Sequence, residues 1–358
     1  MKKKTIAVLF GGQSTEHEVS RLSAATIISN IDPDNYYVIP VGITKTGKWM
    51  IYQGPVENLK SGEWERFGIP AVISPDATQR GLIKVVGGKA KVIPVDVVFP
   101  VLHGAWGEDG TVQGLLELSR IPYVGCGVLS SAVCMDKLFT KMVAKANHIN
   151  QAEYMGLYAD ELSALPKVIK RIERKIGYPC FVKPANAGSS VGISKAKTPE
   201  ELDAALKLAA LYDEKLVVEK AVSGRELEIA VLGDRKKVMT SGVGEILPAA
   251  EFYDYDSKYN DENSKTIVGP DLPEGKAEEI KKTAEKIYRA VDGRGLARVD
   301  FFLEHGTDRV IFNEINTMPG FTSISMFPML MAAEGVSISQ QIDKLIEIAL
   351  WADGGSHE

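Results

Sequence analysis

Two predicted strands near the C-terminus bear side chains that could hold a metal ion. Residues 298–304 and 310–316 are rich in β-branched and aromatic residues and are joined by a short turn. Side chains two apart on a strand share a face, so Glu314 and Asn316 point the same way, and Asp300 can meet them if the strands pair. Two carboxylates and an amide oxygen suit Mg²⁺, which takes further ligands from water and phosphate. A solvated hairpin face is the alternative interpretation, although the constrained turn at 317–320 argues against it.

Cations and backbone donors that could bind phosphate occur earlier in the chain. Lys183 ends a short predicted strand, and the segment 186–192 offers small residues with N–H groups. Such a loop can fold over phosphate oxygens, although many glycine–serine loops are plain turns. Lys137 is a candidate second cation, but a single lysine is by default a surface residue.

Two other glycine-containing segments look like nucleotide motifs but lack a required residue. Residues 42–48 nearly match a P-loop, yet Trp49 follows where a Ser or Thr hydroxyl should hold magnesium. We interpret this segment as a hairpin turn. Gly125-Cys126-Gly127 lacks the third glycine of a dinucleotide fingerprint and is interpreted as a turn as well.

Composition narrows the class of protein. The 358 residues suggest two or three domains at about 150 residues each, and 45% hydrophobic with 25% charged residues is typical of a globular protein. The net charge of -5 does not indicate a nucleic-acid binder. Three cysteines without CxxC spacing argue against a disulfide framework or a zinc site and favour a reducing cytoplasm. The apolar run 6–10 is too short for a signal peptide, and no segment has the length of a membrane span.

The order of predicted elements indicates an α/β fold. Strands at 5–10, 37–43 and 95–101 alternate with a helix at 21–31, which favours a doubly wound parallel sheet in an N-terminal domain.

The remaining elements are predicted from caps and periodicity. We expect one helix from about 130 to 146, strands at 179–184 and 216–219, and a helix capped by Thr198 with Pro199 at its first position. Ile280, Ala284, Ile287 and Val291 follow a helical period, and 337–349 should be a closing helix. The polar, aromatic segment 251–265 has no clear period and is predicted to be a lid loop.

Taken in order, these motifs resemble the ATP-grasp superfamily. The matching segments are Met135-Asp136-Lys137, Val182-Lys183-Pro184, the Gly-Ser-Ser-Val-Gly loop at 188–192, Glu219-Lys220, Arg298-x-Asp300 and Asn313-Glu314-x-Asn316. Within the superfamily, the chain resembles the D-alanine–D-alanine ligase family over nearly its whole length. The more specific matches are the segment 11–20 with Ser14, Glu16 and His17, His103-Gly104 with Gly107-Glu108-Asp109-Gly110, Phe252-Tyr253-Asp254-Tyr255 with Lys258-Tyr259, and the segment 316–322.

The resemblance implies a role for each matching residue. It implies α- and β-phosphate binding by Lys137 and Lys183, adenine and ribose binding by Glu219, Lys220, Val222 and Glu226, and two Mg²⁺ ions, replaceable by Mn²⁺, on Asp300, Glu314 and Asn316. It implies that Glu16 and His103 bind the first D-alanine, that Ser189 and Tyr259 complete a network with Glu16, and that Ser325 binds the second carboxylate. It also implies that Arg298 and the Gly320 N–H stabilise negative charge, and that Lys258 reaches the transferred phosphate.

The resemblance also implies an architecture and a setting. The expected domains are 1–126, a central ATP-grasp domain at 127–219, and a C-terminal domain at 220–358 that contains the lid. The expected protein is a cytoplasmic homodimer that uses ATP and D-alanine for peptidoglycan synthesis and binds neither nucleic acid nor membrane.

Other functions stay open at this point. The nearest alternative is a ligase that joins D-alanine to D-serine or D-lactate, and Ile324 departs from relatives that carry a polar or aromatic residue there. A non-catalytic ATP-binding module would require lost metal ligands or lid cations, and all are present. An ATP-grasp ligase for an unrelated acid is opposed by the segments around Glu16 and His103.

Overall fold

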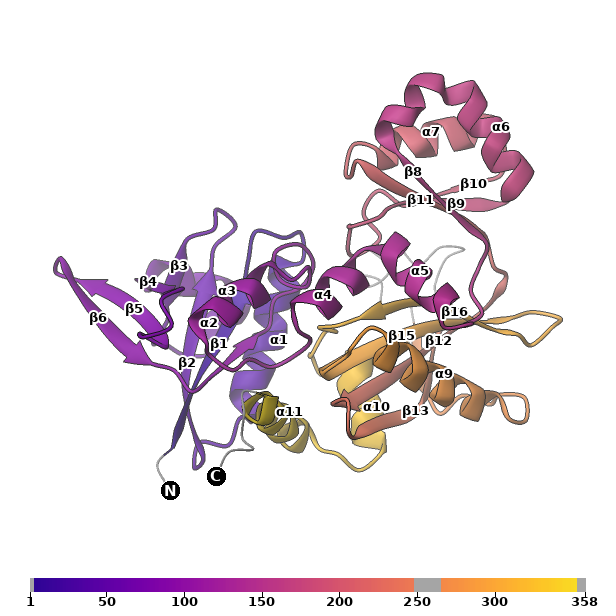
Figure 1. The fold of residues 1–358 in the computed structure, drawn as a ribbon. Helices are drawn as coiled ribbons and strands as arrows, with labels where there is room; N and C mark the ends of the chain where they lie inside the picture. Colours follow the sequence, from indigo (N-terminus) through magenta and orange to yellow (C-terminus); the bar gives the residue numbers. More distant parts are fainter. Residues whose placement is uncertain (1–2, 248–264, 353–358) are drawn as a thin grey trace.

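Three sheets organise residues 3–247 and 265–352, the part of the chain that the computed structural model describes (Figure 1). Their strand orders are β6-β5-β4-β3-β2-β1-β7, β10-β9-β11-β8 and β14-β13-β12-β15-β16. The α/β class predicted from the sequence is therefore confirmed. The predicted lid, including Lys258 and Tyr259, lies outside the described residues, apart from its last residue, Lys265.

The first sheet is parallel only at one end. Its parallel strands are β1 (Lys4–Gly11), β2 (Tyr36–Ile43) and β7 (Val97–Pro100). Its antiparallel strands are β3 (Trp49–Ile51), β4 (Ile69–Ile73), β5 (Gly81–Val86) and β6 (Lys89–Pro94). The helices of this region are α1 (His17–Asn30), α2 (Glu57–Ser61) and α3 (Thr111–Ser119). The segment that nearly matches a P-loop forms the turn between β2 and β3, where the Gly47 N–H donates to the Thr44 carbonyl at 2.9 Å, as predicted.

The second sheet is a small antiparallel layer covered by two helices (Figure 1). Its strands are β8 (Tyr154–Tyr158), β9 (Cys180–Pro184), β10 (Ser194–Ala196) and β11 (Lys215–Lys220). The covering helices are α6 (Leu165–Lys175) and α7 (Pro199–Ala209). Thr198 caps α7 by accepting a hydrogen bond from the Glu201 N–H at 3.3 Å, with Pro199 at the first helical position. This cap was predicted.

The third sheet is antiparallel and has helices on both faces. Its strands are β12 (Gly224–Gly233), β13 (Val238–Leu247), β14 (Lys265–Val268), β15 (Gly295–Glu304) and β16 (Val310–Asn316). One face packs against α9 (Lys276–Ala290) through the predicted periodic residues Ile280, Ala284 and Ile287. The other face packs against α10 (Met326–Ala333) and α11 (Ile338–Ala352).

The single helix predicted over 130–146 is wrong, because the chain breaks at Asp136. The structure has α4 (Val128–Met135) and α5 (Lys137–Ala146) on either side of that residue. Asp136 adopts an extended conformation, and its carboxylate accepts hydrogen bonds from the N–H groups of Leu138 and Phe139 at 2.9 and 3.0 Å. A short acidic side chain that caps a new helix in this way competes with helix continuation.

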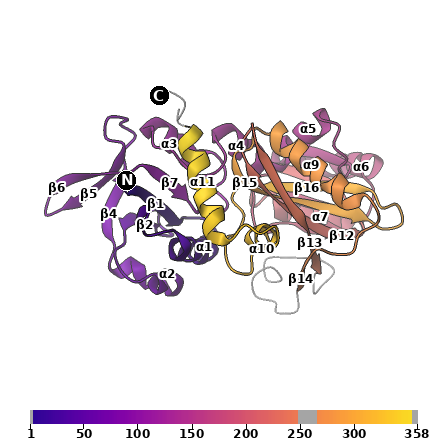
Figure 2. The ribbon, with the colours of Figure 1, turned by 90° about the horizontal axis from the view of Figure 1, so that it is seen from below.

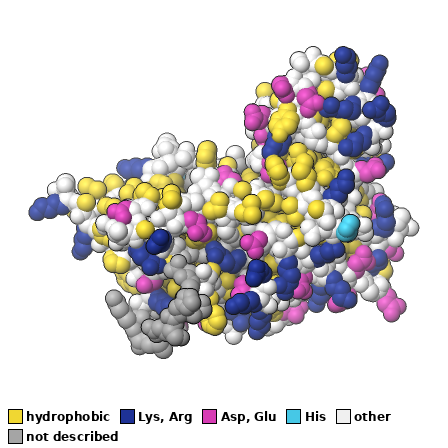
Figure 3. Space-filling view, in the orientation of Figure 1, with side chains coloured by type: hydrophobic (Ala, Val, Ile, Leu, Met, Phe, Trp, Pro, Cys, Tyr) yellow, Lys and Arg dark blue, Asp and Glu magenta, His cyan; other side chains and the backbone are white. Residues whose placement is uncertain are grey.

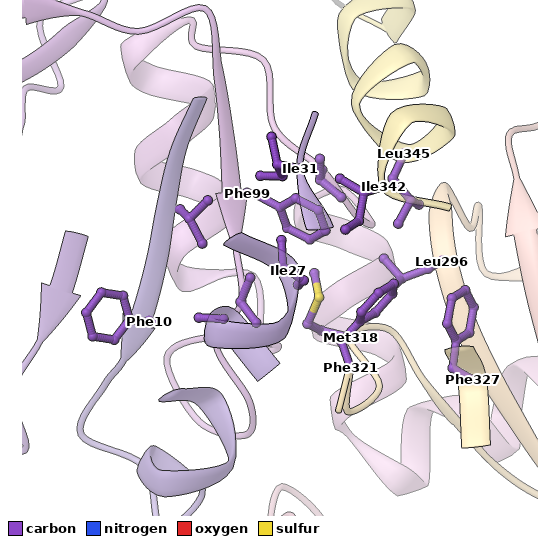
Figure 4. Close-up of a cluster of buried hydrophobic side chains, with 14 of the residues drawn as sticks. Phe10, Ile27, Ile31, Phe99, Leu296, Met318, Phe321, Phe327, Ile342 and Leu345 are labelled. Carbon is purple, nitrogen blue, oxygen red and sulfur yellow. The ribbon is translucent and has the colours of Figure 1, made fainter. Parts of the chain in front are cut away.

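The first and third sheets share one hydrophobic core. Phe10, Ile27 and Phe99 pack in the same cluster as Leu296, Met318, Phe321 and Ile342 (Figure 4). Helix α11 runs back against α1 and β7, which places the last described helix beside the first one (Figure 2). This shared core holds the loops after β1, β7 and β16 in fixed relation. The domain bounds 1–126, 127–219 and 220–358 stay predictions.

No helix among the described residues combines the length and apolar character needed to cross a membrane.

Candidate active site

A cleft of about 1200 Å³ lies where the three sheets meet. Every predicted site residue that the structure describes lines this cleft. These residues are Glu16, His103, Lys137, Lys183, Ser189, Glu219, Lys220, Val222, Glu226, Arg298, Asp300, Glu314, Asn316, Gly320 and Ser325. Residues as far apart in the sequence as Glu16 and Ser325 are thus gathered around one cleft.

The predicted metal ligands meet on the paired strands β15 and β16. Asp300 lies opposite Glu314 and Arg298 lies opposite Asn316, and a register shift follows Asp300. The Asn316 amide donates to Asp300 Oδ2 at 3.1 Å. Among the described residues, no group of three His, Cys, Asp or Glu side chains could hold a metal ion, so a metal here depends on the Asn316 amide as third ligand.

Arg298 is fixed beside these ligands by two carboxylates. Its guanidinium donates to both Asp300 oxygens at 2.8 and 2.7 Å, and it lies 3.2 Å from Glu228 Oε2. Burial alone would lower the pKa of Arg298, but Asp300 and Glu228 raise it well above its usual value. A permanent and immobile positive charge therefore faces the cleft.

The glycine–serine loop brings the second sheet against the first. The Ser189 hydroxyl, from the loop after β9, donates to Glu16 Oε1 at 2.5 Å. Gly104 and Gly188 crowd the same carboxylate, because a Cβ atom on either would lie 2.6 Å from Glu16 Oε2. Gly104 also has a φ of +71°, which favours glycine. Two of the three members predicted for the Glu–Ser–Tyr network are thus in contact.

The predicted phosphate-binding lysines are both close to that loop: Lys137 contacts it, and Lys183 precedes it in the sequence. The Lys137 ammonium, at the first position of α5, donates to the Ala187 carbonyl at 2.6 Å. Lys183, near the end of β9, lies 3.4 Å from Glu219 Oε1. Both lysines are therefore held by oxygen atoms at the edge of the cleft.

His103 and Ser325 occupy the turns that follow β7 and β16. The two ring nitrogens of His103 lie 2.8 Å from the Met318 carbonyl and 3.1 Å from Ser23 Oγ. Burial lowers the pKa of His103 and Glu16 opposes that shift, which favours the neutral ring. Ser325 Oγ accepts from the Thr322 N–H at 3.0 Å, and a Cβ at Gly320 would lie 2.9 Å from it.

Two residues that sequence reasoning did not assign also belong to this region. Glu108 accepts the N–H groups of Gly104 and Met318 at 2.8 and 3.0 Å, and burial, followed by the Glu16 charge, raises its pKa to about 8. Its place in the segment 107–110 beside His103 was a usable signal. Lys141 is buried beside Glu219, and its spacing of four from Lys137 would have placed both lysines on one helix face.

Family models and known proteins match nearly the whole chain. Residues 5–126 match the model described as D-ala D-ala ligase N-terminus, and residues 143–347 match D-ala D-ala ligase C-terminus. A D-alanine–D-alanine ligase of Caldicellulosiruptor bescii is 54% identical over 98% of this chain and 96% of its own length. One of Thermoanaerobacter pseudethanolicus is 52% identical over 98% and 97%.

Solved structures agree in fold along the same length. The VanG D-Ala:D-Ser ligase from Enterococcus faecalis has a TM-score of 0.89 at 39% identity, covering 97% of this chain and 100% of that one. The D-alanine-D-alanine ligase from Coxiella burnetii has a TM-score of 0.84 at 35% identity, covering 98% and 96%.

Proposed function

The chain belongs to the family of D-alanine–D-alanine ligases, and we propose how its central cleft carries out the reaction of that family. It is an ATP-dependent ligase that joins two D-alanines by way of a D-alanyl phosphate, and the dipeptide is used for peptidoglycan synthesis. The observation that carries the residue roles is the meeting of Asp300, Glu314 and Asn316 in the same cleft as Lys137 and Lys183.

The first step makes the carboxyl group of one D-alanine reactive. A carboxylate oxygen attacks the γ-phosphorus of ATP, the bond from that phosphorus to the β–γ bridging oxygen breaks, and ADP leaves. Lys137 and Lys183 bind the α- and β-phosphates, while Glu219, Lys220, Val222 and Glu226 hold adenine and ribose. Such a transfer depends mainly on positioning and on neutralised charge.

The residues of β15 and β16 fit a divalent cation. Asp300, Glu314 and Asn316 would supply oxygen ligands of the kind that Mg²⁺ prefers. Bound Mg²⁺ neutralises phosphate charge and orients the phosphate oxygens. Two Mg²⁺ ions, replaceable by Mn²⁺, belong to this proposal.

The second step forms the peptide bond. The amine of the second D-alanine attacks the acyl carbon, a tetrahedral oxyanion forms, and its collapse expels inorganic phosphate. Arg298, held immobile by Asp300 and Glu228, and the Gly320 N–H stabilise the negative charge. Donors fixed in advance need no reorganisation when that charge develops.

The two D-alanines are oriented by residues on opposite loops. Glu16 pairs with the ammonium of the first D-alanine, with His103 beside it, and Ser325 binds the carboxylate of the second. Ser189 and Tyr259 complete the network with Glu16, and Lys258 reaches the transferred phosphate from the lid. Closure of the lid protects the acyl phosphate from water.

A kinetic comparison tests these roles. Lys183→Ala should weaken ATP binding and phosphoryl transfer, whereas Glu16→Gln should raise the KM for the first D-alanine, because an ammonium loses its counter-charge. Separate KM values for ATP and for D-alanine distinguish the two. If both substitutions affect only ATP, the role of Glu16 is wrong.

A D-alanine–D-serine ligase is the second candidate, favoured by the fold similarity to VanG. Mass spectrometry of the products from equal D-alanine, D-serine and D-lactate at neutral pH discriminates the two. We expect D-alanyl-D-alanine to dominate, since Met326, which follows Ser325 and lines the cleft, offers no hydrogen bond to a hydroxyl. Mostly D-alanyl-D-serine would reject this specificity while leaving the ligase assignment standing.

A homodimer in the cytoplasm completes the proposal. Exposed apolar side chains form a band over α3, α4 and α5 (Figure 3). Leu118 is 65% and Leu129 is 69% exposed, and Phe139 and Met142 continue the band. Leu129→Glu should convert a dimer to a monomer in light scattering. Leu211→Glu, which changes a still more exposed leucine just after α7, should leave the dimer intact. A monomeric wild-type chain would contradict the proposal.

A further inference from the structure

Lys141 is a buried cation that has no part in the roles described so far. It lies on α5, one turn after Lys137, and its side chain is only 2% exposed. Its ammonium is 3.2 Å from Glu219 Oε2, and the Tyr154 ring centre lies 5.6 Å away. Lysine is seldom buried to this degree unless it is paired, so Glu219 is its structural counterpart.

Glu219 is shared between two lysines that differ in their access to the cleft. Lys183 Nζ lies 3.4 Å from Glu219 Oε1, whereas Lys141 Nζ lies 3.2 Å from Glu219 Oε2. Lys183 pairs with Val217 in the ladder of β9 and β11, so its side chain is a diagonal neighbour of Glu219 on one face. The Lys183 side chain is 13% exposed and lines the cleft, whereas the Lys141 side chain is only 2% exposed.

The three side chains carry one more positive than negative charge. Burial lowers the pKa of Lys141, with Glu219 opposing the shift and Lys183 adding to it. Burial would raise the pKa of Glu219, but Lys141 and Lys183 lower it below its usual value. The Glu314 carboxylate also acts on Lys141 and opposes its lowered pKa. Of the two lysines on Glu219, Lys183 is the more exposed and is therefore the one that an incoming anion reaches.

We propose that Lys141 is a positioning residue for ATP, whose ammonium holds the Glu219 carboxylate so that Lys183 can turn to a nucleotide phosphate. Without Lys141, Lys183 would be the only cation on Glu219 among the described residues, and its departure would leave that buried carboxylate without either lysine. A buried carboxylate without a partner is strongly unfavourable, so Lys183 would stay with Glu219. This inference rests on the proposed role of Lys183 at the phosphates.

Calorimetric titration with ADP and steady-state kinetics test the inference. Lys141→Met should raise the Kd for ADP and the KM for ATP by about tenfold, equivalent to about 1.4 kcal/mol, while the KM for D-alanine stays nearly unchanged. Lys141→Arg should recover most of the affinity. Lys145→Met removes an exposed lysine one turn further along the same helix and should change nothing. Unchanged ADP affinity in a folded Lys141→Met variant would overturn the inference.

The Glu219→Gln background separates this role from a general loss of structure. In this background no carboxylate retains Lys183, so adding Lys141→Met should alter ADP affinity by less than about twofold. The same substitution costs about tenfold in the wild type, and two independent sites would not show such a difference between backgrounds. The double variant leaves neither charge of the pair buried alone, so it remains informative if Lys141→Met does not fold. A tenfold loss in that background would overturn the inference.

Lys183→Ala distinguishes the inference from the function on which it rests. If this variant binds ADP as well as the wild type does, the proposed phosphate role of Lys183 is wrong. If it binds ADP weakly while Lys141→Met binds normally, only the inference about Lys141 is wrong.

Discussion

Asp300 is held by hydrogen bonds from Arg298 and from Asn316, so the side chains proposed for metal binding are ordered by their neighbours on the strands. Their alternation along β15 and β16 follows from the two-residue period of a strand, which is why the sequence could predict their meeting. The same period puts Arg298 and Asp300 on one face of β15, but it does not show that these two side chains hydrogen-bond to each other. Arg298 therefore neutralises Asp300 and Glu228 and also presents a positive charge to the cleft.

Glu314 provides the direct test of the metal proposal. Glu314→Gln removes an anionic ligand with almost no change in volume, so the fold should persist. ATP turnover should fall by about 100-fold, because bound metal contributes several kcal/mol to the transition state. ADP release at limiting Mg²⁺ measures this, with Glu304→Gln on the same hairpin as control. Turnover like that of the wild type would contradict the metal assignment.

At the scale of elements, the sequence predicted regular strands and helices well and their interruptions poorly. The α9 period, the Thr198 cap and the pairing of β15 with β16 depend on local patterns and are confirmed. The break at Asp136 was missed because residues 130–146 are apolar enough for one helix. The local cap that Asp136 gives α5 breaks the helix there, and the Lys215 ammonium, 79 residues away, adds a contact of 2.5 Å to Asp136 Oδ2. Lys141 was missed because its partner Glu219 lies on β11, far along the chain from α5.

The break at Asp136 should matter for both stability and ATP. Asp136→Ala removes the acceptor that caps α5, whereas Asp136→Asn keeps that acceptor and loses only the charge opposite Lys215. The alanine variant should be less stable than the asparagine variant by about 1 kcal/mol. It should also have the higher KM for ATP, because Lys137 begins the uncapped helix. Urea unfolding and ATP kinetics on both variants measure the difference, and equal behaviour would contradict it.

Glu108 links the loop after β7 to the turn after β16 and should make stability depend on pH. Its pKa is raised from 4.5 to about 8 in the folded chain, so the folded state holds a proton that the unfolded state releases between these values. Its contribution to stability is therefore fully present below about pH 4.5 and is lost as pH rises to about 8, at up to about 1.4 kcal/mol per pH unit.

Glu108→Gln should remove this slope. The amide does not titrate. The wild type should therefore lose stability relative to the variant steadily as the pH rises from 5 to 8. Urea unfolding at several pH values supplies the comparison. A difference that stays constant over that range would contradict the raised pKa.

At the scale of the whole molecule, the shared core joins the N-terminal sheet to the sheet that bears the residues proposed as metal ligands. No local pattern predicts that α11 packs against α1. The periodicity of an amphipathic helix shows which face is apolar, but not which surface that face covers. The fold class and the gathering of the described candidate residues around one cleft were therefore within reach of the sequence, whereas this long-range packing was not. This core nevertheless fixes Glu16, at the start of α1, relative to Arg298 on β15, because both elements contribute side chains to it.

A cavity in this core should loosen both sheets together. Ile342 on α11 is fully buried in the cluster with Phe10, Ile27 and Leu296, and Ile342→Ala should cost about 2–5 kcal/mol. Because the cluster spans two sheets, hydrogen exchange should accelerate in β1 and β15 as well as in α11. Lys344→Ala, exposed on the same helix, is the matched control and should leave exchange unchanged. Faster exchange confined to α11 would mean that the two sheets hold their positions independently, and the core could not then be what sets the geometry of the cleft.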